Sequence, residues 1–218
     1  MTKKYILFLC FGLTISFATG QSSNPEYDKA VQHVMSTLNC KRPYAEWVMS
    51  KIDEFSNQIQ SDFEYIANSN DTYSKKIAYI PAMISRNFVS ASALIGVSST
   101  SRSYISNYSI NQYLYRLVKI KERYGYTKVE LLFSPDYLGI GQFYKTPDNN
   151  YELSITMWQI FRSWYGDSPA YSDATRKKFR LIFYVDHKNR LKTIKVDRVF
   201  VSETVNINKF KYHSKNKN

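Results

Sequence analysis

The sequence predicts an α+β domain in which an antiparallel sheet packs against helices on one face. In the first third of the chain, apolar residues recur three or four positions apart, which is typical of amphipathic helices. From Thr127 onward the period changes to alternation, which is typical of strands. Three long alternating segments each carry one apolar face. This pattern favours an antiparallel sheet covered on one side.

Three helices are expected before the first strand. Apolar spacing predicts helices over residues 27–38 and 43–66, the second with a proline in its first turn. The Asn-Ser-Asn-Asp stretch at 68–71 ends that second helix. A shorter helix is predicted over 72–88, where Pro81 produces either a kink or a restart.

The remainder of the chain combines strands with one further helix. Residues 93–97 form a short predicted strand, and a Ser/Thr-rich loop follows it as far as Tyr108. Ser109 is placed to cap a helix that Gly125 ends. A loop containing Gly166 is expected before the fourth of the later strands. These later strands are predicted over residues 127–133, 138–145, 151–164, 176–186 and 191–201.

This order, over residues 72–201, resembles the NTF2-like (cystatin-like, cone-shaped α+β) superfamily. Residues 171–178, running into the strand at 179–185, look like the family's penultimate strand entered from a loop. The resemblance implies a curved antiparallel sheet with helices packed in its cone. Members include isomerases and dehydratases that work in the cone, and also binding or scaffold domains without chemistry. It implies a homodimer formed through the open sheet, but a fold does not decide a function.

No catalytic residue carries over from the resemblance. The family's enzymes place an Asp base and Tyr or His groups inside the cone. Here His187 falls in a predicted turn and His33 in the helical extension. Neither position belongs to a strand facing a cone, so no catalytic residue is predicted.

The first twenty residues predict export. Lys3 and Lys4 precede a nearly uncharged apolar run, and Ala18 and Gly20 stand at the small-residue positions before a cleavage site. The alternative is an uncleaved membrane anchor, but the apolar run is shorter than the roughly 20 residues a spanning helix needs. We expect a periplasmic or extracellular protein without a transmembrane span after signal cleavage.

The chain is therefore divided into four predicted segments. Residues 1–20 are the signal peptide, and 21–71 form a helical extension. Residues 72–203 make the NTF2-like domain, and 204–218 form a basic, disordered tail.

Charge and cysteine content exclude several classes of protein. The chain has 30 Lys+Arg against 18 Asp+Glu, a formal net charge of +12. Such a surface attracts nucleic acid, anionic lipid or an acidic partner, and export argues against nucleic acid. Two cysteines are too few for a disulfide scaffold or a Cys-based zinc cluster. The three histidines, His33, His187 and His213, are far apart, so no metal is expected.

No fingerprint of a hydrolase, a phosphate-binding loop or a dinucleotide cofactor occurs, and no cofactor is expected. Cys40 is either a catalytic nucleophile or a structural or free thiol. Paired carboxylates would suit glycoside chemistry, and the alternative is a set of exposed charges on polar faces. The carboxylates considered are Glu130, Asp136, Glu152 and Asp186.

One buried polar position suggests a pocket. Gln159 shares the apolar face of the longest predicted strand, where an unpaired amide costs about 1–3 kcal/mol. It either bonds an internal neighbour or water, or lines a small pocket. Arg198 shares a comparable face of the last strand with Ile194, Val196 and Phe200. A pocket would bring these two residues together with Trp158 and Tyr184 near its mouth.

Aromatic residues suggest a second kind of site. The chain has 19 tyrosines and 3 tryptophans, and Trp164, Tyr165 and Tyr171 cluster along one strand and the residues after it. Aromatic side chains with polar tips are common anchors at interaction surfaces. The alternative is ordinary packing in the core or at a sheet edge.

Two functions from different classes follow. The first is an exported non-catalytic binding or scaffold protein that engages a partner protein or envelope component through its sheet face and basic end. The second is an enzyme of the isomerase or dehydratase type acting on a small apolar ligand in the cone. A third possibility is attachment to an anionic surface through residues 174–218.

Overall fold

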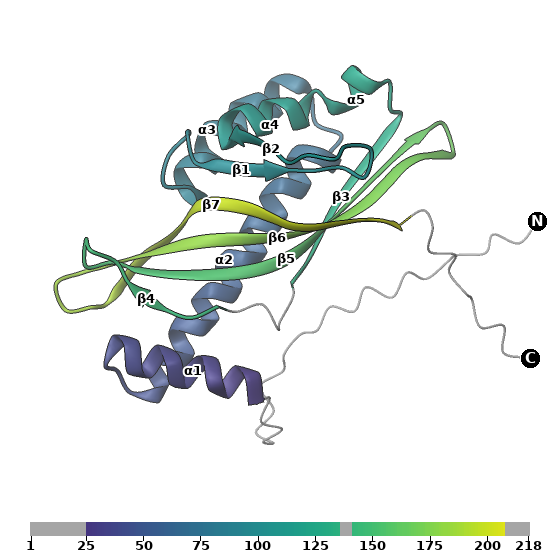
Figure 1. Ribbon diagram of the computed structural model, residues 1–218. Helices are drawn as coiled ribbons and strands as arrows, with labels where there is room; N and C mark the ends of the chain where they lie inside the picture. Colours follow the sequence, from purple (N-terminus) through teal and green to yellow (C-terminus); the bar gives the residue numbers. More distant parts are fainter. Residues whose placement is uncertain (1–24, 136–140, 208–218) are drawn as a thin grey trace, which may run out of the picture.

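The computed structural model describes residues 25–135 and 141–207. In this part of the chain, seven strands form one sheet in the order β2-β1-β7-β6-β5-β3, with β4 paired to β5 (Figure 1). The helices are α1 (Pro25–Leu38), α2 (Arg42–Asn68), α3 (Tyr73–Asn87), α4 (Ile110–Val118) and α5 (Ile120–Tyr124). The strands are β1 (Leu94–Val97), β2 (Ser106–Ser109), β3 (Lys128–Pro135), β4 (Tyr144–Lys145), β5 (Tyr151–Tyr165), β6 (Ser168–Val185) and β7 (Leu191–Asn206).

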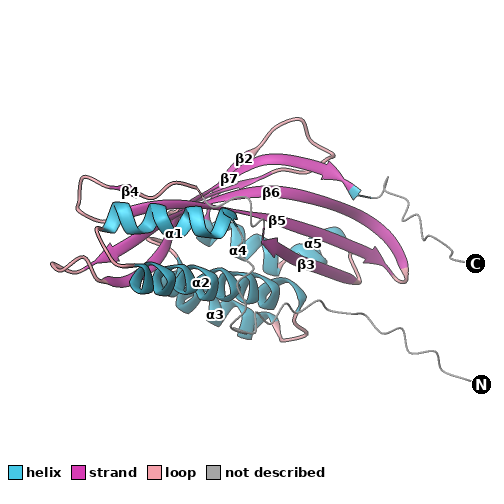
Figure 2. Cartoon of the chain, turned by 90° about the horizontal axis from the view of Figure 1, so that it is seen from below, coloured by secondary structure: helices cyan, strands magenta, loops and turns pink. Residues whose placement is uncertain are grey.

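The predicted α+β class is confirmed. The sheet is curved and unclosed, and α2, α3 and α4 pack against its concave face (Figures 1 and 2). All neighbouring strands pair antiparallel except β1 and β7, which are parallel. The predicted signal peptide, Asp136, His213 and the last eleven residues of the predicted tail lie outside the described residues.

The helix ends follow from local sequence. Thr72 caps α3 by accepting a hydrogen bond from the Lys75 amide. Ser109 and Gln112 form a capping box that starts α4, so the predicted cap is confirmed. Gly125 ends α5 in the left-handed conformation (φ 70°), which a residue without a Cβ adopts without strain.

The helical segment at the start of the described chain and the sheet share one hydrophobic core. Val31 of α1 and Ile59 of α2 are fully buried, as are Leu181 of β6 and Val196 of β7. All four belong to the same cluster of buried side chains. Residues 25–68 are therefore packed into the core that the sheet also builds.

Pairing lengthens the strands beyond their predicted bounds. Residues 165–175 were predicted as a loop, but β6 begins at Ser168 after a tight turn containing Gly166, and it pairs with β5 from its first residue. β7 continues to Asn206, so the start of the predicted tail is strand. In contrast, the strand predicted over 138–145 is represented among the described residues 141–145 by the two residues of β4, Tyr144–Lys145. The Ser/Thr-rich loop ends in β2, a strand that the sequence did not predict.

A β-bulge in β7 overturns one prediction about its faces. Arg180 pairs with Arg198 and Leu181 with Val196, so Asp197 is an extra residue between them. Beyond the bulge the alternation is inverted. Val199 is 1% exposed, and Phe200 is 38% exposed with the Arg198 guanidinium 5.0 Å from its ring. The prediction that Arg198 and Phe200 share the apolar face of the strand is wrong.

Candidate functional site

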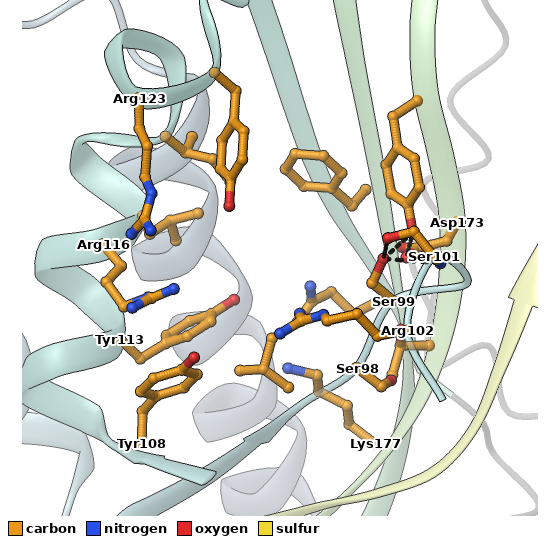
Figure 3. A pocket seen from close by; sticks show the side chains of 18 of the residues that line it. Ser98, Ser99, Ser101, Arg102, Tyr108, Tyr113, Arg116, Arg123, Asp173 and Lys177 are labelled. Atoms are coloured by element: carbon orange, nitrogen blue, oxygen red, sulfur yellow. Dashed lines mark hydrogen bonds between the residues drawn. The ribbon is translucent and has the colours of Figure 1, made fainter. Parts of the chain in front are cut away.

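A cavity of about 490 Å³ lies between the helices and the concave face of the sheet. One wall comes from α4 and α5, and the opposite wall comes from β5 and β6. The loop that joins β1 to β2 lines a further side (Figure 3). A volume of this order accommodates a small organic molecule.

Strand register places a row of polar side chains on the sheet wall. Gln159 of β5 pairs with Thr175 of β6, and Phe161 pairs with Asp173. Since alternate residues of a strand share a face, Lys177 follows Thr175 on the same side. All five side chains line the cavity. The concave face is thus apolar over most of its length and polar at this end.

The helix wall is amphipathic around the cavity. Tyr113 and Leu117 of α4 are buried. Arg116, which lies between them in sequence, is exposed. One to two turns later, Ile120 and Arg123 of α5 continue the lining. Helical spacing of three and four residues brings these groups to one wall.

Tyr171 ties the β1–β2 loop to the sheet. Its hydroxyl lies 2.7 Å from Ser99 Oγ and accepts a hydrogen bond from the Thr100 amide at 3.1 Å. The same hydroxyl donates to the Asp173 carboxylate. A hydroxyl contact between Ser98 and Thr204 of β7 holds the start of this loop. These bonds hold the loop, and the Arg102 that it carries, at the cavity.

The arginines of the cavity form no salt bridge with a described carboxylate, although the charge of Arg102 acts on Asp173. Within the described part of the chain, Arg102, Arg116 and Arg123 form no salt bridge. The Arg116 guanidinium lies 4.4 Å from the centre of the Tyr108 ring, and Arg102 is 3.4 Å from Ser106 Oγ. Figure 3 shows Arg102 pointing toward α4 and Arg116 pointing toward the sheet. Guanidinium groups that form no salt bridge within the protein are suited to bind carboxylates, sulfonates and phosphates.

Lys177 is the most unusual side chain of the site. It is 1% exposed, and its Nζ lies 5.3 Å from the centre of the Tyr113 ring. It has no hydrogen bond or ion pair with any other described residue. Burial lowers the pKa of Lys177 to about 7, and the charge of Asp173 opposes this shift. The amine is therefore partly neutral near physiological pH.

The pKa values of Asp173 and Tyr113 are also raised. Burial raises the pKa of Asp173, while the hydrogen bond from Tyr171 and the charge of Lys177 oppose the change. Burial likewise raises the pKa of Tyr113, and a hydrogen bond with Gln159 opposes it. Strongly perturbed groups gathered in one cavity are typical of functional sites.

The structure separates the four residues of the predicted pocket. Gln159 lines the cavity together with Tyr113 of α4. Trp158 lies on the outer face, because it precedes Gln159 on the strand. Tyr184 and Arg198 are on that outer face too, Arg198 because of the bulge. None of these three lines the cavity.

The three residues of the predicted aromatic surface are also divided. Tyr171 lines the cavity, and its hydroxyl ties the β1–β2 loop to the sheet. Trp164 lies under the Lys128 ammonium, which is 4.6 Å from its ring centre. Tyr165 is 55% exposed at the end of β5, with its ring 5.4 Å from that of Tyr126.

The carboxylates considered for glycoside chemistry and the Cys40 thiol were the other candidate groups in the sequence. Glu130 forms an ion pair with Arg162 at 3.1 Å. Asp186 accepts the Lys188 and Arg190 amides in the β6–β7 turn, and these bonds lower its pKa. Glu152 pairs with Ile182 in the sheet. Burial raises the pKa of the Cys40 thiol, which disfavours its thiolate. No cluster able to hold a metal ion occurs in residues 25–135 and 141–207.

The sequence alone does not predict that basic side chains line the cavity. A usable signal exists in β6, where Tyr171, Asp173, Thr175 and Lys177 continue the same alternation as Phe179. Because the sequence alone predicts a loop before Arg176, it does not show that these polar residues continue the apolar face of the strand. For Arg102, in a loop, no period could have shown its position.

Comparison with known proteins adds no identification. No family model matches the chain, and no curated protein matches its sequence. None of the described helices is both long and apolar enough to cross a membrane.

Proposed function

We propose that the protein is an exported binding protein that holds a small organic anion in the cone of an NTF2-like domain. The observation that carries the proposal is a set of three arginines around one cavity that form no salt bridge with any described residue: Arg102, Arg116 and Arg123. The cavity lining contains these three and Lys177 against one carboxylate, Asp173. An anion bound there would offset the excess positive charge of the cavity lining.

The walls specify the rest of the ligand. Tyr113, Leu117 and Phe161 present ring and aliphatic surface to the cavity, and Tyr124 and Tyr126 line it further. Such walls favour a flat apolar body, and the guanidinium groups favour an acid group at one end. The proposed ligand is therefore an aromatic or compact aliphatic acid, sulfonate or phosphate ester.

Two further parts of the proposal are the superfamily and the export of the protein. Membership of the NTF2-like superfamily is supported by the order of elements from α3 through β1 and α4 to the long antiparallel strands. Export to the periplasm or the cell exterior is supported by the pattern of residues 1–20.

The test is a fluorescence titration with anilinonaphthalene sulfonate, an aromatic anion, on the folded protein. We expect saturable binding with one site per chain. Arg116→Gln should weaken it about 5- to 30-fold, since one charge-assisted hydrogen bond is worth about 1–2 kcal/mol. The matched control is Lys178→Gln, which removes one charge from the outer face of β6 and should leave the affinity unchanged. Equal affinity of Arg116→Gln and the unchanged protein would contradict the proposal.

A second candidate, partner binding, is favoured by the outer face of the sheet. Trp158, Ile160 and Tyr184 are only half-buried there. The resemblance implies that a second copy of the chain covers such a face. A sedimentation experiment that finds only monomer at tens of micromolar protein would contradict a homodimer.

A further inference from the structure

We propose that Lys177 is a nucleophilic amine that forms an imine with the carbonyl group of an anionic aldehyde or ketone bound in the cavity. The inference rests on the proposed function, because the arginines would bring the carbonyl compound to the amine. It adds a reactive group and a substrate class to that site.

The position of Lys177 is built by the fold. Pairing with Met157 sets its backbone on the concave face, and the Tyr113 ring of α4 lies over its amine. Figure 3 shows the ammonium pointing from the sheet toward α4, on the same side of the cavity as Arg102. A ligand whose acid group pairs with an arginine would place its other end among these groups.

No described hydrogen-bond acceptor holds the amine charged, and burial outweighs the charge of Asp173 and the Tyr113 ring, which favour the ammonium. Lys177 is 1% exposed and forms no hydrogen bond with another described residue. A buried ammonium without hydrogen bonds is costly, so the neutral form is favoured. Its pKa of about 7 leaves about half of the amine unprotonated at neutral pH. An exposed lysine with an ordinary pKa has less than about 0.1% in that form.

The chemistry balances without an oxidant or reductant. The amine nitrogen attacks the carbonyl carbon, and the carbonyl π electrons move to oxygen to give a carbinolamine. Loss of water then forms the C=N bond, and the departing hydroxyl takes one proton. Both protons of the amine nitrogen pass to the departing oxygen and leave in the water. The Asp173 carboxylate, which lines the same cavity and whose charge acts on Lys177, is the acid-base group that relays them. The net reaction joins amine and carbonyl and releases water.

A different role for Lys177 is an ionic contact to a second acid group of the ligand. The two roles differ in their need for a carbonyl group. An ionic contact would bind an acid and an aldehyde of similar shape alike, and it would form no covalent adduct.

The experiment traps the imine with sodium cyanoborohydride. The folded protein is incubated at pH 7 with para-formylbenzoate and the reductant, then digested and mapped by mass spectrometry. We expect a reduced adduct at Lys177 that forms at least about tenfold faster than at any surface lysine. Lys177→Met and Lys177→Arg should lose this adduct, and Lys178→Met should keep it. Circular dichroism shows whether each variant is folded, and Lys177→Arg retains a cation if Lys177→Met does not fold.

A second probe separates the two proposals. Para-(hydroxymethyl)benzoate has the same acid and ring but no carbonyl group, and its competition with anilinonaphthalene sulfonate reports binding alone. If the alcohol competes and the aldehyde is not trapped at Lys177, the imine is wrong and the anion site stands. If neither compound competes or reacts, both proposals are contradicted.

Discussion

Lys177 is a buried cation that no described hydrogen bond stabilises, so its presence should reduce the stability of the fold. Residues kept at such a cost are typical of functional sites, where activity and stability oppose each other. The groups around it are Asp173 from its own strand, Tyr113 from α4, Arg102 from the β1–β2 loop on the same side of the cavity, and Arg116 from α4 across it.

This residue gives a prediction with a defined pH dependence. Because the native pKa of Lys177 is about 7 and an unfolded lysine titrates near 10.4, the unfolded chain binds more protons between these values. The destabilisation is therefore complete below pH 7 and declines as the pH rises toward 10.4. Lys177→Met, which removes the charge and keeps the volume, should be more stable than the unchanged protein at pH 6. Its advantage should shrink by about 2–3 kcal/mol between pH 6 and pH 9.

Urea unfolding at a series of pH values measures this difference directly. Lys178→Met serves as the control, since the side chain of Lys178 is exposed on the opposite face of the same strand. An advantage of Lys177→Met that does not change with pH would show that the buried amine does not titrate as described.

Individual residues were predictable where alternation continued without interruption. Gln159 was recognised because it interrupts an apolar face, and the structure places it in the cavity. Arg198 was assigned to the wrong face because Asp197 is an extra residue in the strand. A bulge depends on pairing with a neighbouring strand, and a single sequence does not show that pairing.

Among the secondary-structure elements, α2 and α3 are joined by a buried polar network. Asp62, which is 1% exposed, accepts hydrogen bonds from Arg86 Nη2 at 2.7 Å and Gln58 Nε2 at 2.9 Å. It also accepts from Tyr79 and Asn87 of α3. One carboxylate therefore satisfies donors from two helices.

Removal of the Asp62 carboxylate should weaken the attachment of α2 to α3. We expect Asp62→Ala to lower the free energy of unfolding by about 3–5 kcal/mol, since it leaves a guanidinium and an amide without their acceptor. The control is Glu54→Ala, which breaks the exposed ion pair with Lys51 and should cost less than about 1 kcal/mol. Urea denaturation compares the two, and similar small effects would show that the network does not hold α2 to α3.

Elements were predicted best where local signals mark their ends. The long helices have a clear apolar period, Thr72 and Ser109 cap the starts of α3 and α4, and Gly125 ends α5. Strands without an apolar face were missed. β2 is short and polar, and the first half of β6 gains its structure from pairing with β5. Cross-strand pairing outweighs local propensity in such segments.

At the scale of the whole molecule, curvature of the sheet creates the site. The long strands bend around α2, α3 and α4, and the cavity lies where α4 and α5 face the polar end of β5 and β6 (Figures 1 and 3). The fold class could be predicted from the change of period alone. The cavity could not, because its lining comes from a loop, two helices and two strands distant in sequence.

The most direct test of the anion site maps a bound ligand onto the backbone. The protein, labelled with nitrogen-15, is titrated with anilinonaphthalene sulfonate, and amide chemical shifts are followed by NMR. We predict saturable shifts concentrated at cavity residues such as Arg102, Arg116, Gln159, Asp173 and Lys177, and absent at Lys178 on the outer face. Shifts confined to the outer face, or no saturable shifts, would contradict the account.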